Sequence, residues 1–177
     1  MSTLRTDRLL LRGWRPEDLE PFAELNADRE VMRHYPAPLD REQSDALAEQ
    51  SGRSIAGRGW GLWAVEVIDG APFVGFVGLA VPGFDAPFMP DVEVGWRLAR
   101  PFWGHGYATE AARAAVAYGF DELALDEIVS FTTGANERSQ RVMERLGMRR
   151  DPTGDFEHPR MPVGHRLRPH LLYRLPR

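Results

Sequence analysis

The stretch that most constrains this chain is residues 93–112, EVGWRLARPFWGHGYATEAA, where a strand pattern runs through a glycine turn into a helix pattern. The first turn of a helix exposes about four backbone N–H groups without intrahelical partners and carries the positive end of the helix dipole. Gly104 and Gly106 would let an anion approach these groups without a Cβ in the way. A phosphate group is the natural ligand of such a turn.

The glycine turn also admits interpretations other than a phosphate site of this kind. A P-loop needs Gly-Lys-Ser or Gly-Lys-Thr, which does not occur, and a dinucleotide-binding fingerprint needs a third glycine where this sequence has Thr109. That fingerprint also belongs to the first strand of a βαβ unit, whereas this turn follows a run of strands joined by hairpins. The turn could equally be a plain connection into an alanine-rich helix that packs closely on a sheet.

The spacing of apolar residues predicts one mixed α/β domain over residues 1–177. We predict strands at 8–14, 60–68, 73–81, 91–98, 128–133 and 171–175. We predict helices at 16–26, 29–35, 40–56, 106–120 and 136–146, with Gly147 ending the last one. Residues 82–90 contain three prolines and are predicted to form a loop.

Composition excludes several classes of function. The 177 residues carry a net charge of −4 and no basic block, which argues against a nucleic-acid partner. There is no cysteine, which removes disulfides, thiolate metal sites and a cysteine nucleophile together. No apolar run approaches the roughly 20 residues of a membrane helix, and residues 1–12 lack the apolar core of a signal peptide. We therefore expect a cytoplasmic protein that does not bind membranes.

Three segments in chain order resemble the GNAT N-acetyltransferase superfamily, in particular its RimJ/RimL branch of ribosomal-protein-acetyltransferase-like proteins. From the N-terminus, the segments are 7–12 with 16–19, 93–98 with 103–111, and 136–139 with 146–148. The resemblance therefore covers about residues 5 to 150. It implies a single-domain fold with a central, mostly antiparallel, twisted sheet of about six to seven strands flanked by about four helices. It is also compatible with a homodimer.

The resemblance implies acetyl-coenzyme A as the acyl donor and an amine as the acceptor. The backbone of six consecutive residues would hold the pyrophosphate: Gly104, His105, Gly106, Tyr107, Ala108 and Thr109. The backbone of Trp96 and Leu98 would pair with the pantetheine amides, so that the pantetheine acts as an added strand. Trp103 stands where the superfamily pattern begins with Gln or Arg, so its side chain either contacts phosphate or only packs.

Transfer of an acetyl group to an amine requires the neutral amine. The resemblance implies direct attack by the amine, and the absence of cysteine excludes an acetyl-cysteine intermediate. Strand alternation places Glu93 on the same face as Gly95 and Arg97. Glu93 is therefore the candidate general base, acting directly or through water. The alternative is a carboxylate on a solvated strand face, paired with Arg97.

Ser139 is the candidate for protonating the departing thiolate. It lies three residues after Asn136, so both side chains share one helical face. Asn136 would bind the cofactor through its amide, cap the helix, or do both. Met143 either packs on the cofactor or belongs to the core.

The acceptor site is expected near the early helices. Residues 17–49 contain ten acidic residues and three arginines, which either attract a cationic amine or form solvated helix faces. Trp14, His34 and Tyr35 stand at the ends of early elements and are candidates for the pocket lining. His158, His165 and His170 do not match the usual spacing of metal ligands, so no metal is expected.

These observations predict an acetyl-CoA-dependent N-acetyltransferase. The acceptor stays open among a protein N-terminus, an amino acid, a polyamine and an aminoglycoside. One alternative is a non-catalytic module on the same fold that senses acyl-CoA or binds a partner protein. Another is an NAD-type nucleotide enzyme.

Overall fold

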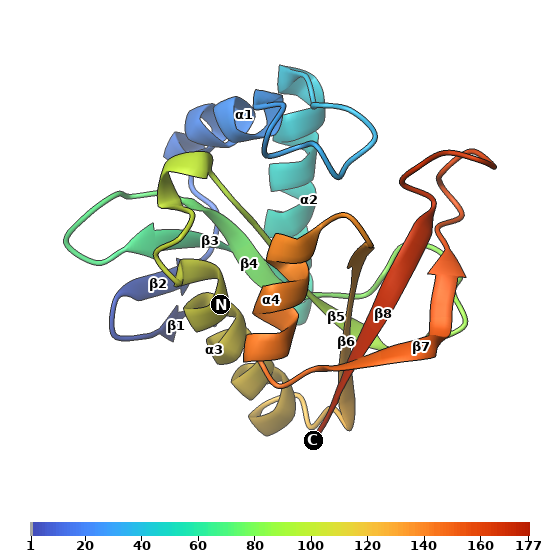
Figure 1. Ribbon diagram of the computed structural model, residues 1–177. Coiled ribbons are helices and arrows are strands. Elements are labelled where there is room, and N and C mark those ends of the chain that lie inside the picture. Colours follow the sequence, from blue (N-terminus) through green and yellow to red (C-terminus); the bar gives the residue numbers. More distant parts are fainter. Residues whose placement is uncertain (1) are drawn as a thin grey trace.

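The computed structural model describes residues 2–177 and contains one sheet of eight strands in the order β1-β2-β3-β4-β5-β6-β8-β7 (Figure 1). The pairs of neighbouring strands are antiparallel except β5 and β6, which are parallel. The strands are β1 (Leu4–Arg5), β2 (Leu9–Arg12), β3 (Leu62–Val67), β4 (Gly75–Ala80), β5 (Val92–Leu98), β6 (Glu127–Thr133), β7 (Arg149–Glu157) and β8 (Pro169–Pro176). The prediction of a mixed α/β fold with a mostly antiparallel sheet is confirmed.

Four α-helices in the described residues cover the sheet, the number that the family resemblance implies and one fewer than the apolar spacing predicts. They are α1 (Leu19–Ala27), α2 (Arg41–Arg58), α3 (Tyr107–Asp121) and α4 (Glu137–Arg145), with 3-10 turns η1 (Pro16–Asp18) and η2 (Arg100–Phe102). The fully buried Ala111, Ala112 and Ala115 of α3 pack against β-strand side chains such as Val77 and Leu79. Their small size permits the close approach that the alanine-rich pattern predicts.

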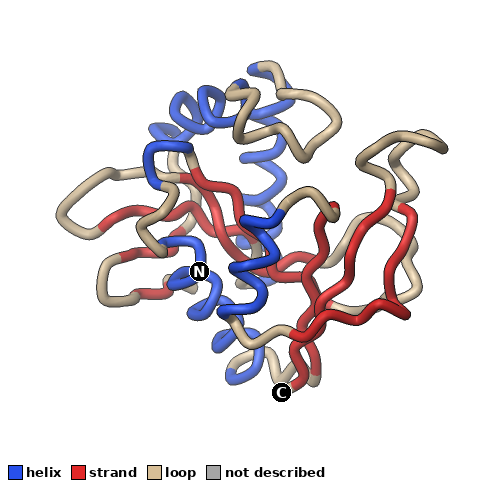
Figure 2. Tube along the Cα trace, in the orientation of Figure 1, coloured by secondary structure: helices blue, strands red, loops and turns tan. Residues whose placement is uncertain are grey.

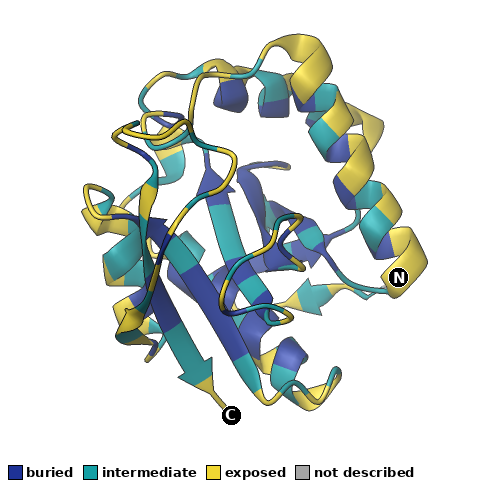
Figure 3. Cartoon of the chain, turned by 90° about the vertical axis from the view of Figure 1, so that its right-hand side faces the viewer, coloured by how far each residue is buried: buried dark blue, intermediate teal, exposed yellow. Residues whose placement is uncertain are grey.

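The opposite face of the sheet is covered by α1 and α2. Phe22 of α1 and Ala48 of α2 join Ala64 and Phe76 of the sheet in a second buried cluster. Neighbouring residues of a strand face opposite sides of the sheet. Trp63 therefore belongs to the cluster that contains the α3 alanines, whereas Ala64 belongs to the cluster that contains Phe22 and Ala48. Figure 3 shows the central strands largely buried, whereas the outer helix faces and the connecting loops are exposed.

Local signals explain where the helices begin and end. Asp40 accepts a hydrogen bond from the Gln43 N–H, and the Gln43 side chain accepts one from the Asp40 N–H, which caps α2 at the predicted position. Gly59 ends α2 in the left-handed conformation, with φ of 82°. Gly147, with φ of 86°, follows α4 as predicted.

The helix predicted at 29–35 is wrong. Residues 29–34 form turns within the loop between α1 and α2 (Figure 2). The Asp28 side chain accepts a hydrogen bond from the Glu30 N–H at 2.8 Å, which offers the backbone an alternative to a helix, and Pro36 and Pro38 stop any continuation. The apolar spacing there reflects Val31 and Met32, which are buried in the cluster below α1 and α2.

The sheet has eight strands rather than the six to seven expected. The two-residue β1 and the edge strand β7 were not predicted. In β7 most residues are polar or exposed, Pro152 and Gly154 interrupt the pattern, and the pairing with β8 is irregular between Asp151 and Phe156. An edge strand with one solvated side gives little apolar alternation, so the sequence carries almost no signal for it.

Candidate active site

The parallel strands β5 and β6 separate soon after they meet. Their pairing comprises Val92 with Ile128 and Glu93 with Val129, whereas β4 stays paired with β5 from Glu93 to Leu98. At the point of separation the Ser130 hydroxyl donates a hydrogen bond of 2.9 Å to the Val94 carbonyl oxygen. The rest of β5 therefore borders an opening on its β6 side.

The backbone of two β5 residues faces this opening. Since the Val94 carbonyl points toward β6, strand alternation directs the N–H and C=O of Trp96 and Leu98 to the same side. The Leu98 carbonyl already accepts a hydrogen bond of 2.7 Å from the indole N–H of Trp103. The N–H and C=O of Trp96 and the N–H of Leu98 are thus placed to pair with an extended ligand, as the family resemblance implies.

The glycine turn leads directly from β5 and η2 into α3. Gly104 and Gly106 have φ of 81° and 82°, a conformation that favours glycine, and a Cβ on Gly104 would meet no atom within 4 Å. Gly106 caps α3 without a side-chain bond, and the first helical bond joins the Glu110 N–H to the Gly106 carbonyl. Within residues 2–177, no backbone acceptor satisfies the N–H groups of Tyr107, Ala108 and Thr109. The turn is built to receive an anion.

Arg8 holds this turn in place. Its guanidinium donates to the His105 carbonyl at 3.1 Å and to the Glu110 carboxylate at 2.7 Å, and it lies 4.9 Å from the centre of the Tyr107 ring. The Arg8 side chain is 49% exposed, so it can also meet a ligand anion. Sequence reasoning missed this role because Arg8 and Glu110 are far apart in the chain; the one available signal was Arg8 within the segment 7–12 that carries the family resemblance.

The side chains around the turn divide into packing and surface groups. The indole N–H of Trp103 is used by Leu98, and the exposed Arg138 lies 4.4 Å above the Trp103 ring, so Trp103 packs instead of presenting its N–H to phosphate. The exposed His105 stacks on Tyr107 at 5.4 Å. Thr109 is buried, which leaves its backbone N–H as the group available to a ligand.

Asn136 and Ser139 meet at the start of α4. The Asn136 carbonyl oxygen accepts from the Ser139 N–H at 3.3 Å, which confirms the helix-cap interpretation. The Asn136 amide donates to the Ser139 hydroxyl at 3.0 Å and to the Thr132 hydroxyl at 2.9 Å. Because Ser139 accepts this bond, its own hydroxyl proton is free to be donated elsewhere. Met143, one turn later, is 1% exposed and belongs to the main core.

Glu93 lies on the sheet face opposite α3. Burial raises the pKa of its carboxyl to about 7, although part of the side chain stays accessible. Within residues 2–177 Glu93 forms no ion pair. The alternative pairing with Arg97 is wrong, because Arg97 binds Asn26 at 2.5 Å. A carboxyl with a pKa near neutrality and no counter-charge is suited to accepting a proton.

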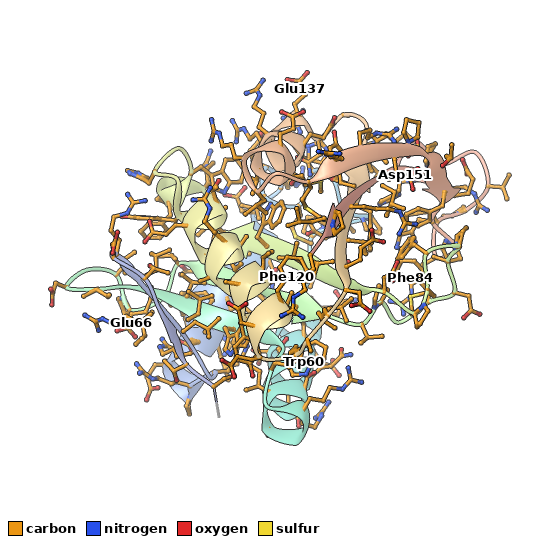
Figure 4. All side chains as sticks on the ribbon, turned by 90° about the horizontal axis from the view of Figure 1, so that it is seen from below. Trp60, Glu66, Phe84, Phe120, Glu137 and Asp151 are labelled. Carbon is orange, nitrogen blue, oxygen red and sulfur yellow. The ribbon has the colours of Figure 1, made fainter. Side chains whose placement is uncertain are left out.

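An aromatic cluster lies on the Glu93 side of β6 and β8. It contains Phe84, Phe88, Phe131 and Phe156 together with the rings of His158 and His170. Figure 4 shows Phe84 on the same side of the molecule as Asp151 of β7. Desolvation is the largest cause that lowers the pKa of His158 to about 4, and it also lowers the pKa of His170, so both rings are neutral near pH 7.

The three candidate acceptor residues have different surroundings. His34 lies with its Nδ1 3.4 Å from the Thr133 hydroxyl at the end of β6, and desolvation lowers its pKa. Tyr35 stacks on the Arg97 guanidinium at 4.1 Å. Trp14 instead donates its indole N–H to the Leu62 carbonyl at 2.8 Å and packs on Phe22, which gives it a structural role away from the opening.

The loop between α1 and α2 also contacts the loop between β7 and β8. The Arg166 side chain donates to the Arg33 carbonyl at 3.3 Å, so the two loops are in direct contact. Six of the ten acidic residues at 17–49 form ion pairs with arginines, for example Asp18 with Arg12 and Glu20 with Arg41. This favours the helix-surface interpretation of that segment.

Two further classes of site receive no support. Residues 2–177 contain no group of three or more His, Asp or Glu side chains placed to hold a metal ion. Across the same residues, no helix combines the length and apolarity needed to cross a membrane.

Comparison with known proteins identifies the family. Residues 8–149 match the acetyltransferase (GNAT) domain. The chain belongs to the GNAT acetyltransferase family. The predicted acyltransferase activity is thereby confirmed, and the glycine turn is accounted for without a P-loop or a dinucleotide-binding fingerprint.

Relatives agree with this assignment. The uncharacterized YkkB of Bacillus subtilis is 33% identical over 148 residues, covering 83% of this chain and 85% of the relative. The FsC-acetyl coenzyme A-N(2)-transacetylase of Aspergillus fumigatus is 35% identical over 153 residues, which is 82% of this chain but 64% of the fungal protein. A GNAT acetyltransferase from Bacillus anthracis superposes with a TM-score of 0.80 at 27% identity, covering 99% of this chain and 98% of the other.

Proposed function

We propose that this GNAT protein is an acetyl-CoA-dependent N-acetyltransferase of the RimJ/RimL-like branch that transfers acetyl directly to a primary amine. The observation that carries the proposal is the continuity of two features: the opening beside Trp96 and the glycine turn with free N–H groups lie at successive positions of one chain segment. An extended ligand with an anionic end fits this segment. The branch assignment rests on the motif residues at 93–98 and 103–111.

The residues present fit coenzyme A. The N–H groups from Gly104 to Thr109 and the nearby Arg8 guanidinium would hold its diphosphate, because both carry positive charge toward the same turn. The peptide groups of Trp96 would pair with the pantetheine amides. The name of the fungal relative supports acetyl coenzyme A as donor and a nitrogen atom as acceptor. When bound, the donor supplies a thioester whose carbonyl carbon is open to attack.

Glu93 would act as the general base. A lysine amine has a reference pKa of ~10.4 and an α-amine of ~8, so either must lose a proton before it attacks. With its own pKa near 7, Glu93 is half ionised at neutral pH and can take that proton directly or through water. The aromatic cluster lies on the same face of the sheet, and its two histidines are neutral near pH 7.

Ser139 would act at the other end of the reaction. Asn136 fixes the Ser139 oxygen by donating to it, which leaves the hydroxyl proton directed away from the amide and available to the departing sulfur. Asn136 and Met143 have cap and core roles in the fold, so any contact that they make with the donor is additional to those roles.

Nothing favours the non-catalytic alternative. The open N–H groups alone would suit a sensor, but a carboxyl with a pKa near 7 and a positioned hydroxyl on the two sides of one opening have no evident use without chemistry. We further propose a cytoplasmic location and leave a homodimer as the expected assembly.

The proposal is tested in two steps. Acetyl-CoA and NAD are compared in a thermal-shift assay, where only a ligand of the native state raises the melting temperature. Acetyl-CoA is expected to do so and NAD is not. Products carrying an added acetyl group are then sought by mass spectrometry across an amine library. Stabilisation by NAD alone, or acetyl-CoA binding without any acetylated product, would contradict the proposal.

A further inference from the structure

Arg97 is a buried cation without a carboxylate partner. It is 9% exposed, and within residues 2–177 no acidic oxygen lies within ion-pair distance of it. One Nη atom donates to the Asn26 side-chain oxygen at 2.5 Å, whereas the buried Nε has no partner at all. Buried charges in proteins are as a rule paired with an opposite charge. The Arg97 guanidinium has no such counter-charge.

The surroundings fix the position of Arg97 without neutralising it. The Tyr35 ring lies 4.1 Å and the Phe76 ring 5.4 Å from the guanidinium carbon. Asn26, which is fully buried, donates its amide to the Ser44 hydroxyl at 2.9 Å and therefore presents its oxygen to Arg97. Stacking and a neutral acceptor do not neutralise the guanidinium, so a planar anion that reached its Nη atoms would supply the missing counter-charge.

Arg97 also faces free space. It lines a cavity of about 240 Å³ with Tyr35, Leu39 and Gln43. On the same face of β5, a Cβ placed on Gly95 would meet no atom within 4 Å, so no side chain fills the space directly above this residue. Gly95 lies midway between Arg97 and Glu93, and all three residues face the same side of the sheet.

We propose, on the basis of the transferase function above, that the amine acceptor carries a carboxylate that binds Arg97 while its amine lies at Glu93. Glu93 and Arg97 are four residues apart on one face of β5, which places their Cα atoms about 13 Å apart, so the acceptor must separate its amine from its carboxylate by a chain of several atoms. An ω-amino acid such as 6-aminohexanoate, or a dipeptide with a free carboxylate, has this spacing. Polyamines and aminoglycosides lack the anion and are poor acceptors.

The test compares matched acceptors that differ in charge alone. At saturating acetyl-CoA, kcat/KM is measured for 6-aminohexanoate and 6-aminohexanamide, and for glycylglycine and glycylglycinamide. Charge-assisted hydrogen bonds predict that the wild type prefers each acid by about 10- to 100-fold. Glycine and 8-aminooctanoate extend the series, and the preference should be greatest at intermediate length.

The variants are Arg97→Met, Arg97→Lys and, as a matched control, Arg53→Met on the exposed surface of α2. Arg97→Met should abolish the acid preference by raising KM for the acids, Arg97→Lys should keep part of it, and Arg53→Met should keep all of it. The acid-to-amide ratio is measured within one preparation, so partial unfolding of a variant does not change it. Binding of 6-aminohexanoate is followed in parallel by calorimetry.

The outcomes separate this inference from the proposed function. Acetylation of amines with no acid preference, or an unchanged ratio in Arg97→Met, overturns the carboxylate site and leaves the transferase standing. If no amine is acetylated but 6-aminohexanoate binds the wild type and not Arg97→Met, the anion site is supported and the proposed function fails.

Discussion

Replacing Glu93 by glutamine should stabilise the protein at alkaline pH. The pKa of Glu93 is raised from 4.5 to about 7 by burial, so the folded state prefers the protonated form. The unfolded chain therefore binds fewer protons than the folded one between about pH 4.5 and 7, and stability falls as pH rises through that window. At one pKa unit per 1.36 kcal/mol, ionised Glu93 costs at most about 3 kcal/mol at pH 8.

Glutamine has the same shape and no charge, so Glu93→Gln removes this cost. Chemical denaturation at pH 8 should show a gain of about 1–3 kcal/mol, falling to near zero at pH 4.5 where the wild-type carboxyl is also neutral. Glu24→Gln, at an exposed position of α1, is the control and should change stability little at either pH. A loss of stability in Glu93→Gln at pH 8 would refute the argument that this carboxyl is buried without a partner.

The same variant should lose activity. Wild-type kcat/KM should rise tenfold per pH unit up to about pH 7 and then level, apart from the separate titration of the acceptor amine. In Glu93→Gln, kcat/KM should fall by about 10²-fold or more, and the inflection of the pH profile near pH 7 should disappear. The inflection that comes from titration of the acceptor amine should remain. A variant that retains wild-type turnover and the inflection would show that another group is the base.

Changes at three other residues test the donor side. Ser139→Ala should lower kcat by about 10²-fold with little change in KM for acetyl-CoA, and Ser54→Ala on α2 should not; equal effects would contradict a specific proton donor. Gly106→Ala and Gly106→Trp introduce the same backbone strain, but only the tryptophan side chain fills the turn. Calorimetry should therefore show weakened acetyl-CoA binding in Gly106→Ala and no binding in Gly106→Trp. Arg8→Gln should weaken acetyl-CoA binding with a reduced salt dependence, and unchanged affinity would remove Arg8 from the site.

Strong local patterns explain which parts of the fold were predictable. The alternating residues of β3, β4 and β5, and the caps of α2 and α4, act within a few residues, and the structure places these elements where the sequence predicts them. The turns at 29–34 have helical apolar spacing because Val31 and Met32 are anchored in a core that only tertiary structure creates. The edge strand β7 is stabilised by its pairing with β8, which its own residues do not reveal.

In the candidate site, too, features set by residues close together in the chain were predictable, and features that depend on residues far apart in the chain were not. The glycine turn and the Asn136–Ser139 pair are local, so sequence spacing was enough to select them. The environment of Arg97 was not predictable, because Asn26 lies 71 residues away in the chain and strand alternation alone suggested Glu93 as the partner. The Arg8 contact with the turn is equally remote in sequence.

A crystal structure of the protein soaked with coenzyme A tests the central claim most directly. The diphosphate is predicted to lie within hydrogen-bond distance of the N–H groups between Gly104 and Thr109, with the pantetheine along β5 at Trp96 and the sulfur near Ser139. A ligand bound elsewhere, or a turn whose N–H groups stay unused in the complex, would contradict the account.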